Sequence, residues 1–221
     1  MHTAILRRTG GVLVAVGLVD IAVMVYCIAN RISYSSSLNI FAVIAGILLL
    51  RGSLRAASLL RWFCVFTLLS LLSVLIGSPF WQPLDLTLTQ VQLNPIASLT
   101  VVAIGAFSLW LLFWVARQLG RPPILAALST ARIKQRDMRI PAAIGIGLGV
   151  ILTVSLVAGL QRGASAEHAK WIAEQEVGAG YRFHVRSLSI TLNNQSKSVS
   201  GVVTAWNKNE VKDIPVHWVE Q

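Results

Sequence analysis

The chain has 221 residues, of which 55% are hydrophobic and only 13% are charged. A soluble domain carries about 25% charged residues, so this composition excludes an ordinary soluble globular protein. The formal net charge of +10 would suit a nucleic-acid-binding protein, but the excess Lys and Arg residues lie between apolar segments rather than in a basic domain. We therefore expect a membrane protein without a nucleic-acid partner.

Acidic residues divide the chain into two parts. Residues 1–160 contain three acids, whereas residues 161–221 contain six acids and seven Lys or Arg residues. The sequence therefore predicts a transmembrane domain over 1–160 and a small polar α+β domain over 161–221. Cys27 and Cys64 fall near opposite ends of different apolar segments, so we expect no disulfide between them.

Five apolar segments are long enough to cross a bilayer as helices, which takes roughly 20 residues each. They run over residues 11–29, 33–50, 62–80, 96–116 and 140–160. The first segment follows two arginines, as a signal peptide does. It is longer than a usual signal sequence and no small-residue cleavage site follows it, so we expect an uncleaved helix. The predicted fold class is mainly α, with a five-helix transmembrane bundle before an α+β domain outside the cytoplasm.

Basic residues predict how these spans are oriented. The N-terminus and the segments 51–61 and 117–139 together carry eleven Lys or Arg residues, whereas the other two loops carry only Arg31. The positive-inside rule then places the N-terminus in the cytoplasm, and an odd number of spans places the C-terminal domain on the other side. We expect a multi-pass protein of a bacterial inner membrane, with its C-terminal domain in the periplasm.

Asp20 is the one acid near the middle of a predicted span. Such a residue costs at least ~2.5–3.5 kcal/mol on membrane-insertion scales, so it is a candidate functional group. Its alternatives are a protonated carboxyl and a structural hydrogen bond to a hydroxyl of another span, at Thr67, Ser70 or Ser73. The spans offer no second buried charge to relay a proton, which favours the structural role.

Small residues line one face of the last predicted span, at Ala142, Gly145, Gly149 and Thr153. Small residues let two helix backbones approach closely in a membrane, so we expect a helix-packing face here. The glycines of this run also resemble a dinucleotide-binding loop, but no strand precedes them and they lie within a span.

The inner segment 117–139 is both basic and partly apolar. Pro122 and Pro123 can begin a short helix, which would lie on the bilayer surface. Contacts with anionic lipid at the inner face are predicted for Arg121, Arg132, Lys134, Arg136 and Arg139. The alternative is an ordinary loop whose charges only orient the spans.

The outer segment 78–95 is long and almost uncharged. Leu84, Leu86 and Leu88 alternate with polar residues as in a strand, while Leu84, Leu88 and Val91 fit helical spacing, so periodicity leaves both open. The segment is too apolar for a free loop. We expect Leu84, Leu86 and Leu88 to dock on the C-terminal domain, and the alternative is that the segment lies on the bilayer.

The C-terminal part predicts a helix over 166–177, capped by Ser165, and strands over 181–192, 199–206 and 211–219. Apolar residues change parity between Val185 and Leu188, which predicts a bulge near Arg186 or Ser187 in an antiparallel meander. His168, His184 and His217 lack close ligand spacing, so we expect no metal site.

No motif in the chain indicates catalysis, since no span carries paired acids or a Ser/His pair. We expect a non-enzymatic protein without a cofactor, which presents its outer domain to other membrane or periplasmic subunits. It would be an accessory, assembly or structural subunit of a larger envelope complex. The alternative is a small oligomeric transporter or channel that uses Asp20.

Overall fold

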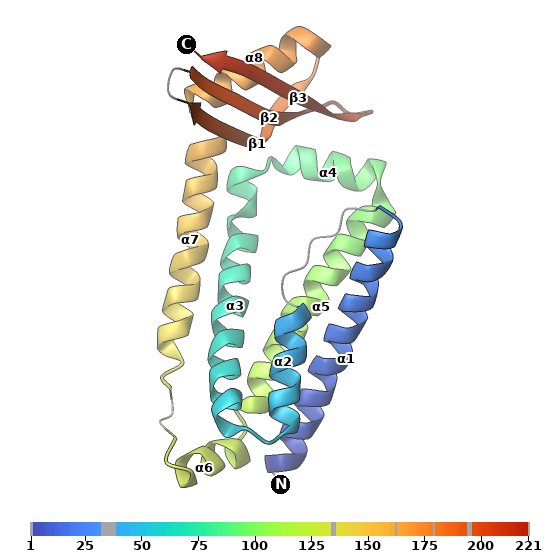
Figure 1. The fold of residues 1–221 in the computed structure, drawn as a ribbon. Helices are drawn as coiled ribbons and strands as arrows, with labels where there is room; N and C mark the ends of the chain where they lie inside the picture. The colour runs from blue at the N-terminus through green and yellow to red at the C-terminus, as the bar shows by residue number, and fades with distance from the viewer. Residues whose placement is uncertain are drawn as a thin grey trace. The chain divides into compact units, whose positions relative to one another are not determined.

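A computed structural model describes residues 2–31, 39–133, 136–161, 163–178, 180–193 and 196–220. Figure 1 shows a mainly helical chain that ends in a three-stranded sheet. The helices are α1 (His2–Ala29), α2 (Asn39–Leu50), α3 (Leu54–Trp81), α4 (Leu84–Leu93), α5 (Pro95–Leu119), α6 (Pro122–Thr130), α7 (Arg139–Gln161) and α8 (Ala164–Val177). The strands are β1 (Arg182–Asn193), β2 (Ser196–Trp206) and β3 (Val211–Glu220).

Four of these helices, α1, α3, α5 and α7, are long and apolar enough to cross a membrane. They correspond to four of the five predicted spans, and most extend beyond the predicted bounds by several residues. The helix of the remaining predicted span, α2, has 12 residues and is about 18 Å long, shorter than a hydrocarbon core of about 30 Å. Residues 33–38 of that predicted span lie outside the described residues.

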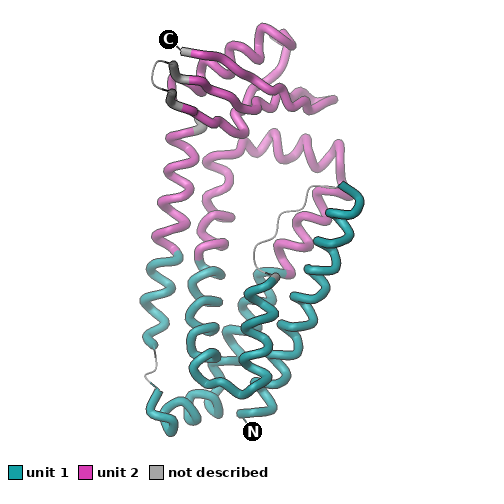
Figure 2. Tube along the Cα trace, in the orientation of Figure 1, with its two compact units in different colours: residues 1–69, 108–145 teal, residues 70–107, 146–221 magenta. Residues whose placement is uncertain are grey.

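The chain forms two compact units, coloured separately in Figure 2. Unit 1 comprises residues 1–69 and 108–145, and unit 2 comprises residues 70–107 and 146–221. Because α3, α5 and α7 each contribute to both units, this division follows packing along the helices. The predicted boundary between residues 160 and 161 stays a prediction.

Close backbone packing joins α1 to α2 in unit 1. A Cβ atom built on Gly10 would lie 2.7 Å from the carbonyl oxygen of Gly46 and 3.0 Å from the amide nitrogen of Leu50. A Cβ atom on Gly46 would in turn meet Val14. The order of these contacts shows that α2 runs antiparallel to α1, with backbones closer than any larger residue allows.

The core of unit 1 gathers the segments that carry the basic residues. It contains the start of α1, the end of α2, the start of α3, the end of α5 and most of α6. Its buried members are Leu6, Leu13, Leu49, Ala57, Cys64, Val115, Leu119, Ile124 and Leu128. The N-terminus and the basic segments 51–61 and 117–139 therefore meet at one end of this unit.

In unit 2, α7 packs closely on α3. A Cβ atom on Gly149 would lie 2.5 Å from the Cβ of Ser73 and 3.0 Å from the carbonyl oxygen of Ser70. One turn further along each helix, a Cβ atom on Gly77 would lie 2.4 Å from the Oγ1 of Thr153. Small residues on both helices therefore make this contact possible.

The sheet has the order β1-β2-β3 and is antiparallel throughout. Its register shifts between Val185, which pairs with Val203, and Ser187, which pairs with Val202. Arg186 is therefore the extra residue of a β-bulge, which confirms the predicted position. The bulge returns Leu188 to the face that carries Val185, and α8 packs on this face through Ala166, Ala169 and Ala173.

Two local features differ from the sequence-based expectation or decide between alternatives. The helix α8 begins at Ala164 with Gly163 as its N-cap, so the predicted cap at Ser165 is wrong and Ser165 lies in the first turn. The ambiguous segment 84–93 is the helix α4, preceded by Pro83 and carrying Asp85 in its first turn, where an acid is favoured by the helix dipole.

Candidate functional site

The sheet has one apolar and one polar face. Side chains alternate along a strand, so the register assigns every second residue to the face opposite α8. That face is rich in small hydroxyl residues, namely Ser187, Ser189, Thr191, Ser198, Ser200 and Thr204. The apolar face is covered by α8, which leaves the polar face as the candidate interaction surface.

A charged network lies on this polar face beside the bulge. Nη1 of Arg186 donates to Oδ2 of Asp213 at 2.6 Å, and the hydroxyl of Thr204 donates to Oδ1 of the same carboxylate at 2.7 Å. The bulge supplies Arg186 because the extra residue has no partner in the ladder. One carboxylate thus joins all three strands of the sheet.

An open pocket of about 380 Å³ adjoins the network. It is lined by Arg186, Ser187, Val202, Asp213 and Pro215. The side chains of Arg186 and Asp213 are 66% and 44% exposed, so both charges are accessible to a partner. Pro215, which also lines the pocket, has no backbone N–H. It lies on the edge strand β3, where a proline discourages pairing with a further strand.

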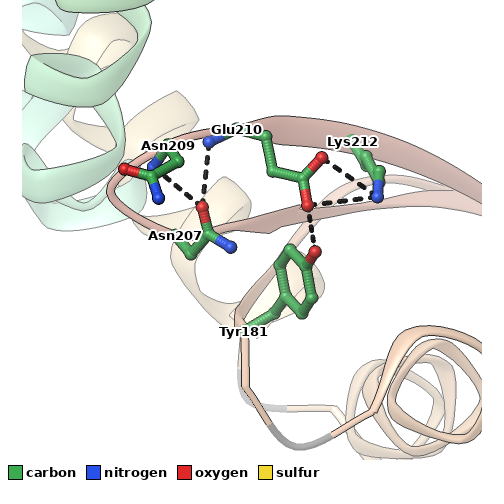
Figure 3. Close-up of polar contacts among 5 residues, drawn as sticks. All are labelled: Tyr181, Asn207, Asn209, Glu210 and Lys212. Carbon is green, nitrogen blue, oxygen red and sulfur yellow. Dashed lines mark hydrogen bonds and ion pairs between the residues drawn. The ribbon is translucent and has the colours of Figure 1, made fainter.

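A second polar cluster fixes the turn between β2 and β3 (Figure 3). The Asn207 side-chain oxygen accepts hydrogen bonds from the amides of Asn209 and Glu210, at 2.8 and 2.9 Å. The hydroxyl of Tyr181 and the Nζ of Lys212 both donate to the Glu210 carboxylate. These contacts connect Tyr181, just before β1, to the turn between β2 and β3.

The same contacts change the proton affinity of both charged groups. The hydrogen bond from Tyr181, followed by that from Lys212, lowers the pKa of Glu210 below its ordinary value. The hydrogen bond to Glu210 raises the pKa of Lys212. Both residues are therefore charged at neutral pH, and the cluster is held by a charge-assisted contact.

The start of β1 also contacts α4, since Nη1 of Arg182 pairs with Oδ2 of Asp85. Residues near this contact are buried: Leu86 on α4 is 2% exposed, and Trp206, which is paired with Arg182 in the ladder, is 5% exposed. Leu84 and Leu88 are each 61% exposed. Docking by all three leucines stays a prediction, and the observed link is the ion pair.

One ionisable side chain, that of His184, is buried at this end of the polar face. His184 is 8% exposed and pairs in the ladder with Thr204. Desolvation by burial, with a smaller contribution from the positive charge of Lys170, lowers the pKa of His184. This imidazole is therefore neutral at neutral pH.

The other predicted site residues lie apart from the sheet. Gly149 and Thr153 contact α3, while Gly145 is buried and Ala142 is partly buried in unit 1. Asp20 is half-buried in α1. The Thr67 hydroxyl is buried without a hydrogen-bond partner among the described residues, so it is not the partner of Asp20. Whether Asp20 has a functional role stays a prediction.

The predicted lipid-contacting residues surround α6, whose helix begins at the two prolines as the sequence indicates. Arg121 is its N-cap, Arg132 follows its C-cap, Arg136 lies in the next segment and Arg139 begins α7. Lys134 lies outside the described residues. Lipid contact itself stays a prediction.

The histidines do not converge. Among the described residues, no three His, Cys, Asp or Glu side chains are placed to hold a metal ion. The ring of His168 instead contacts the rings of Trp171 and Trp218, with centroid distances of 5.6 and 5.1 Å. Cys27 and Cys64 are free thiols.

Sequence reasoning missed the residues of the sheet network. The sequence indicates Arg186 only as a possible bulge position, and it places Asp213 and Pro215 within a predicted strand without a role of their own. A charged residue at a bulge, opposite an acid on the far strand, was the available signal. No protein-family model, curated protein or solved structure matches the chain, so no relative assigns a role to these residues.

Proposed function

We propose that this chain is a non-enzymatic integral membrane protein that holds its α8–sheet module at one membrane surface as a docking module for a partner subunit. The observation that carries the proposal is the exposed Arg186–Asp213 network beside an open pocket, on a sheet whose other face is filled by α8. An accessory or assembly subunit of a larger envelope complex would have this arrangement.

Two features support a fixed presentation of the module. α7, an apolar helix of membrane length, runs to Gln161, and α8 begins at Ala164, so the sheet follows the membrane segment after a very short connection. The Asp85–Arg182 pair then links the sheet to α4, which connects two other membrane-length helices. A module tied at two points presents its face with less conformational freedom than one on a flexible linker.

The proposed orientation places the sheet in the periplasm and the N-terminus in the cytoplasm, with α2 completing a fifth crossing. The convergence of the basic segments at one end of unit 1 supports this scheme, since such residues are retained on the cytoplasmic side. Reporter fusions at Arg55 and Gln118 should read cytoplasmic, and fusions at Asp85 and Gln221 periplasmic. A cytoplasmic signal at Gln221 would overturn the orientation.

The docking role is tested by placing a photo-cross-linking amino acid at Ser187, in the pocket, or at Trp171, on the exposed side of α8. We expect one discrete heterologous adduct from position 187 and none from position 171. Arg186→Glu should abolish the adduct, because it places two acids side by side in the network. Adducts only between copies of this chain would contradict the proposal and favour an oligomeric channel.

A further inference from the structure

The basic end of unit 1 contains a pocket that the proposed docking role does not use. The pocket has a volume of about 460 Å³ and is lined by Arg55, Ser58, Ala131, Arg132, Ile133 and Arg136. We call it the arginine pocket. Its size falls within the range of about 300–1,000 Å³ that is typical of small-ligand sites in proteins.

Three arginines line this pocket without acidic partners. Among the residues that the structure describes, no carboxylate pairs with Arg55, Arg132 or Arg136. The nearest acid in sequence, Asp137, accepts a hydrogen bond from the amide of Arg139. Three guanidinium groups around one cavity create a concentrated positive potential, which an anion would neutralise.

The start of α3 adds to this potential. Ser53 caps the helix, since its Oγ accepts a hydrogen bond from the amide of Ala56 at 3.3 Å. The first turn of α3 carries Arg55 and no acid, so a positive side chain stands at the positive end of a 28-residue helix. This placement is unfavourable alone and becomes favourable when an anion occupies the pocket.

Arg132, just after the end of α6, has a backbone conformation that is unfavourable for residues other than glycine. Its φ is +53°, in the left-handed region, and the amide of Ile133 donates to the carbonyl of Leu128 in the pattern that closes helices. α2 ends in the same pattern, but with Gly52 at the left-handed position. Glycine adopts this conformation without steric cost, so Arg132 occupies a position where glycine fits better.

We propose that the arginine pocket binds the phosphate group of an anionic ligand. Guanidinium groups form paired hydrogen bonds with phosphate oxygens, which a compact ammonium group does not match. On the proposed orientation the pocket opens at the cytoplasmic membrane surface. The phosphate therefore comes from an anionic lipid headgroup or from a soluble phosphate, and both have the same recognition chemistry.

Binding is measured on the full-length protein in neutral detergent, by thermal unfolding against added ligand. We expect short-chain phosphatidylglycerol to raise the unfolding temperature, whereas phosphatidylcholine, which has no net charge, should not. Arg55→Gln and Arg136→Gln should each weaken the apparent affinity about tenfold, the loss of one charge-assisted contact. Inorganic phosphate is tested at the same ionic strength against chloride. Protection by inorganic phosphate alone assigns a soluble ligand, and protection by the lipid alone assigns a headgroup.

Two matched controls separate the pocket from general surface charge. Arg7→Gln removes one charge from α1, outside the pocket, and should weaken binding less than twofold. Arg132→Gly and Arg31→Gly relieve the same left-handed strain at the ends of two helices, since Arg31 has φ +55°. Only Arg132→Gly should weaken binding. The proposal is overturned if neither anion protects the protein, or if both controls weaken binding as much as the pocket variants. This readout needs no partner subunit, so its failure is distinct from failure of the docking role.

Discussion

Asp85 in the first turn of α4 accepts a charge-assisted hydrogen bond from Arg182 at the start of β1, although the two residues are 97 positions apart in the sequence. This ion pair joins the segment between α3 and α5 to the C-terminal sheet. The side chains are 62% and 69% exposed, so solvent screens the attraction. The pair therefore contributes little to the free energy of unfolding, and its main effect is on where the sheet contacts α4.

We expect the coupling between these two residues to be small. In a double-mutant cycle with Asp85→Asn and Arg182→Gln, the interaction free energy should be below about 1 kcal/mol, as for other exposed pairs. It should decrease further at high salt, because the charges are solvated. Thermal unfolding of the four proteins in detergent measures both effects, and a coupling above about 2 kcal/mol would mean that the pair is desolvated.

Burial of Leu86 should contribute more than the ion pair. Leu86→Ala is expected to lower the free energy of unfolding by about 2–5 kcal/mol, because Leu86 is 2% exposed and its truncation leaves a cavity. Leu84→Ala removes the same atoms from an exposed side chain of the same helix and should change stability by about 0.5 kcal/mol or less. Equal effects of the two substitutions would show that Leu86 packs against nothing specific.

The α3–α7 contact predicts opposite outcomes for two glycines in one helix. Gly149→Ala places a methyl group against Ser73 and the Ser70 carbonyl, and should cost about 1–3 kcal/mol of stability. A Cβ atom built on Gly147 would meet no atom of another helix within 4 Å, so Gly147→Ala should be neutral or stabilising through its higher helix propensity. Unfolding temperatures in detergent compare them directly, and a neutral Gly149→Ala would exclude the close contact.

The sheet also requires a residue without a side chain at Gly201, which pairs with Leu188 after the bulge. A Cβ atom there would lie 2.3 Å from the carbonyl oxygen of Ser187 and 2.8 Å from the side chain of Leu188. Gly201→Ala should destabilise the sheet by about 1–3 kcal/mol, seen as faster proteolysis of the C-terminal segment. Gly180→Ala is the matched control, because a Cβ atom built there would meet no atom within 4 Å beyond its chain neighbours. Equal protease resistance in both variants would argue against the bulge.

His184 should make stability depend on pH. Because burial lowers its pKa in the folded chain, the unfolded chain binds a proton more readily as the pH falls below about 6.5. The contribution is therefore complete above pH 6.5 and decreases toward the lower pKa of the folded state. The unfolding temperature should fall between pH 7.5 and 5.5, and less so in His184→Gln than in the exposed-site control His217→Gln. Identical profiles in the two variants would remove His184 as the cause.

The bulge could be predicted from the sequence because it changes the alternation of apolar and polar residues along one strand. Tyr181, Phe183 and Val185 share one parity and Leu188, Ile190 and Leu192 share the other, and a two-faced sheet permits this only with one inserted residue. Long apolar runs similarly located the four membrane-length helices, since each encodes its own length. Information within ten to twenty neighbouring residues was sufficient in both cases.

Other features depend on partners that are distant in sequence. The segment 84–93 fits helical and strand spacing equally well, and Asp85 within it pairs with an arginine 97 positions later in the sequence. Ser165 is a good cap by type, yet Gly163 is the N-cap of α8 and Ser165 lies in its first turn. Arg186 and Asp213 meet only because β2 separates their strands by a fixed register, which no local pattern encodes.

The extra residue in β1 shifts which sequence positions before it point to the apolar face of the sheet. Deleting Arg186 would leave an uninterrupted ladder, with every backbone pair still available. Val185 would still pair with Val203 and Ser187 with Val202, so Phe183 and Val185 would stay on the face that α8 covers. Deletion of Arg186 should therefore preserve the apolar face of β1 and remove the contact with Asp213, so its effect should resemble that of a substitution of Arg186.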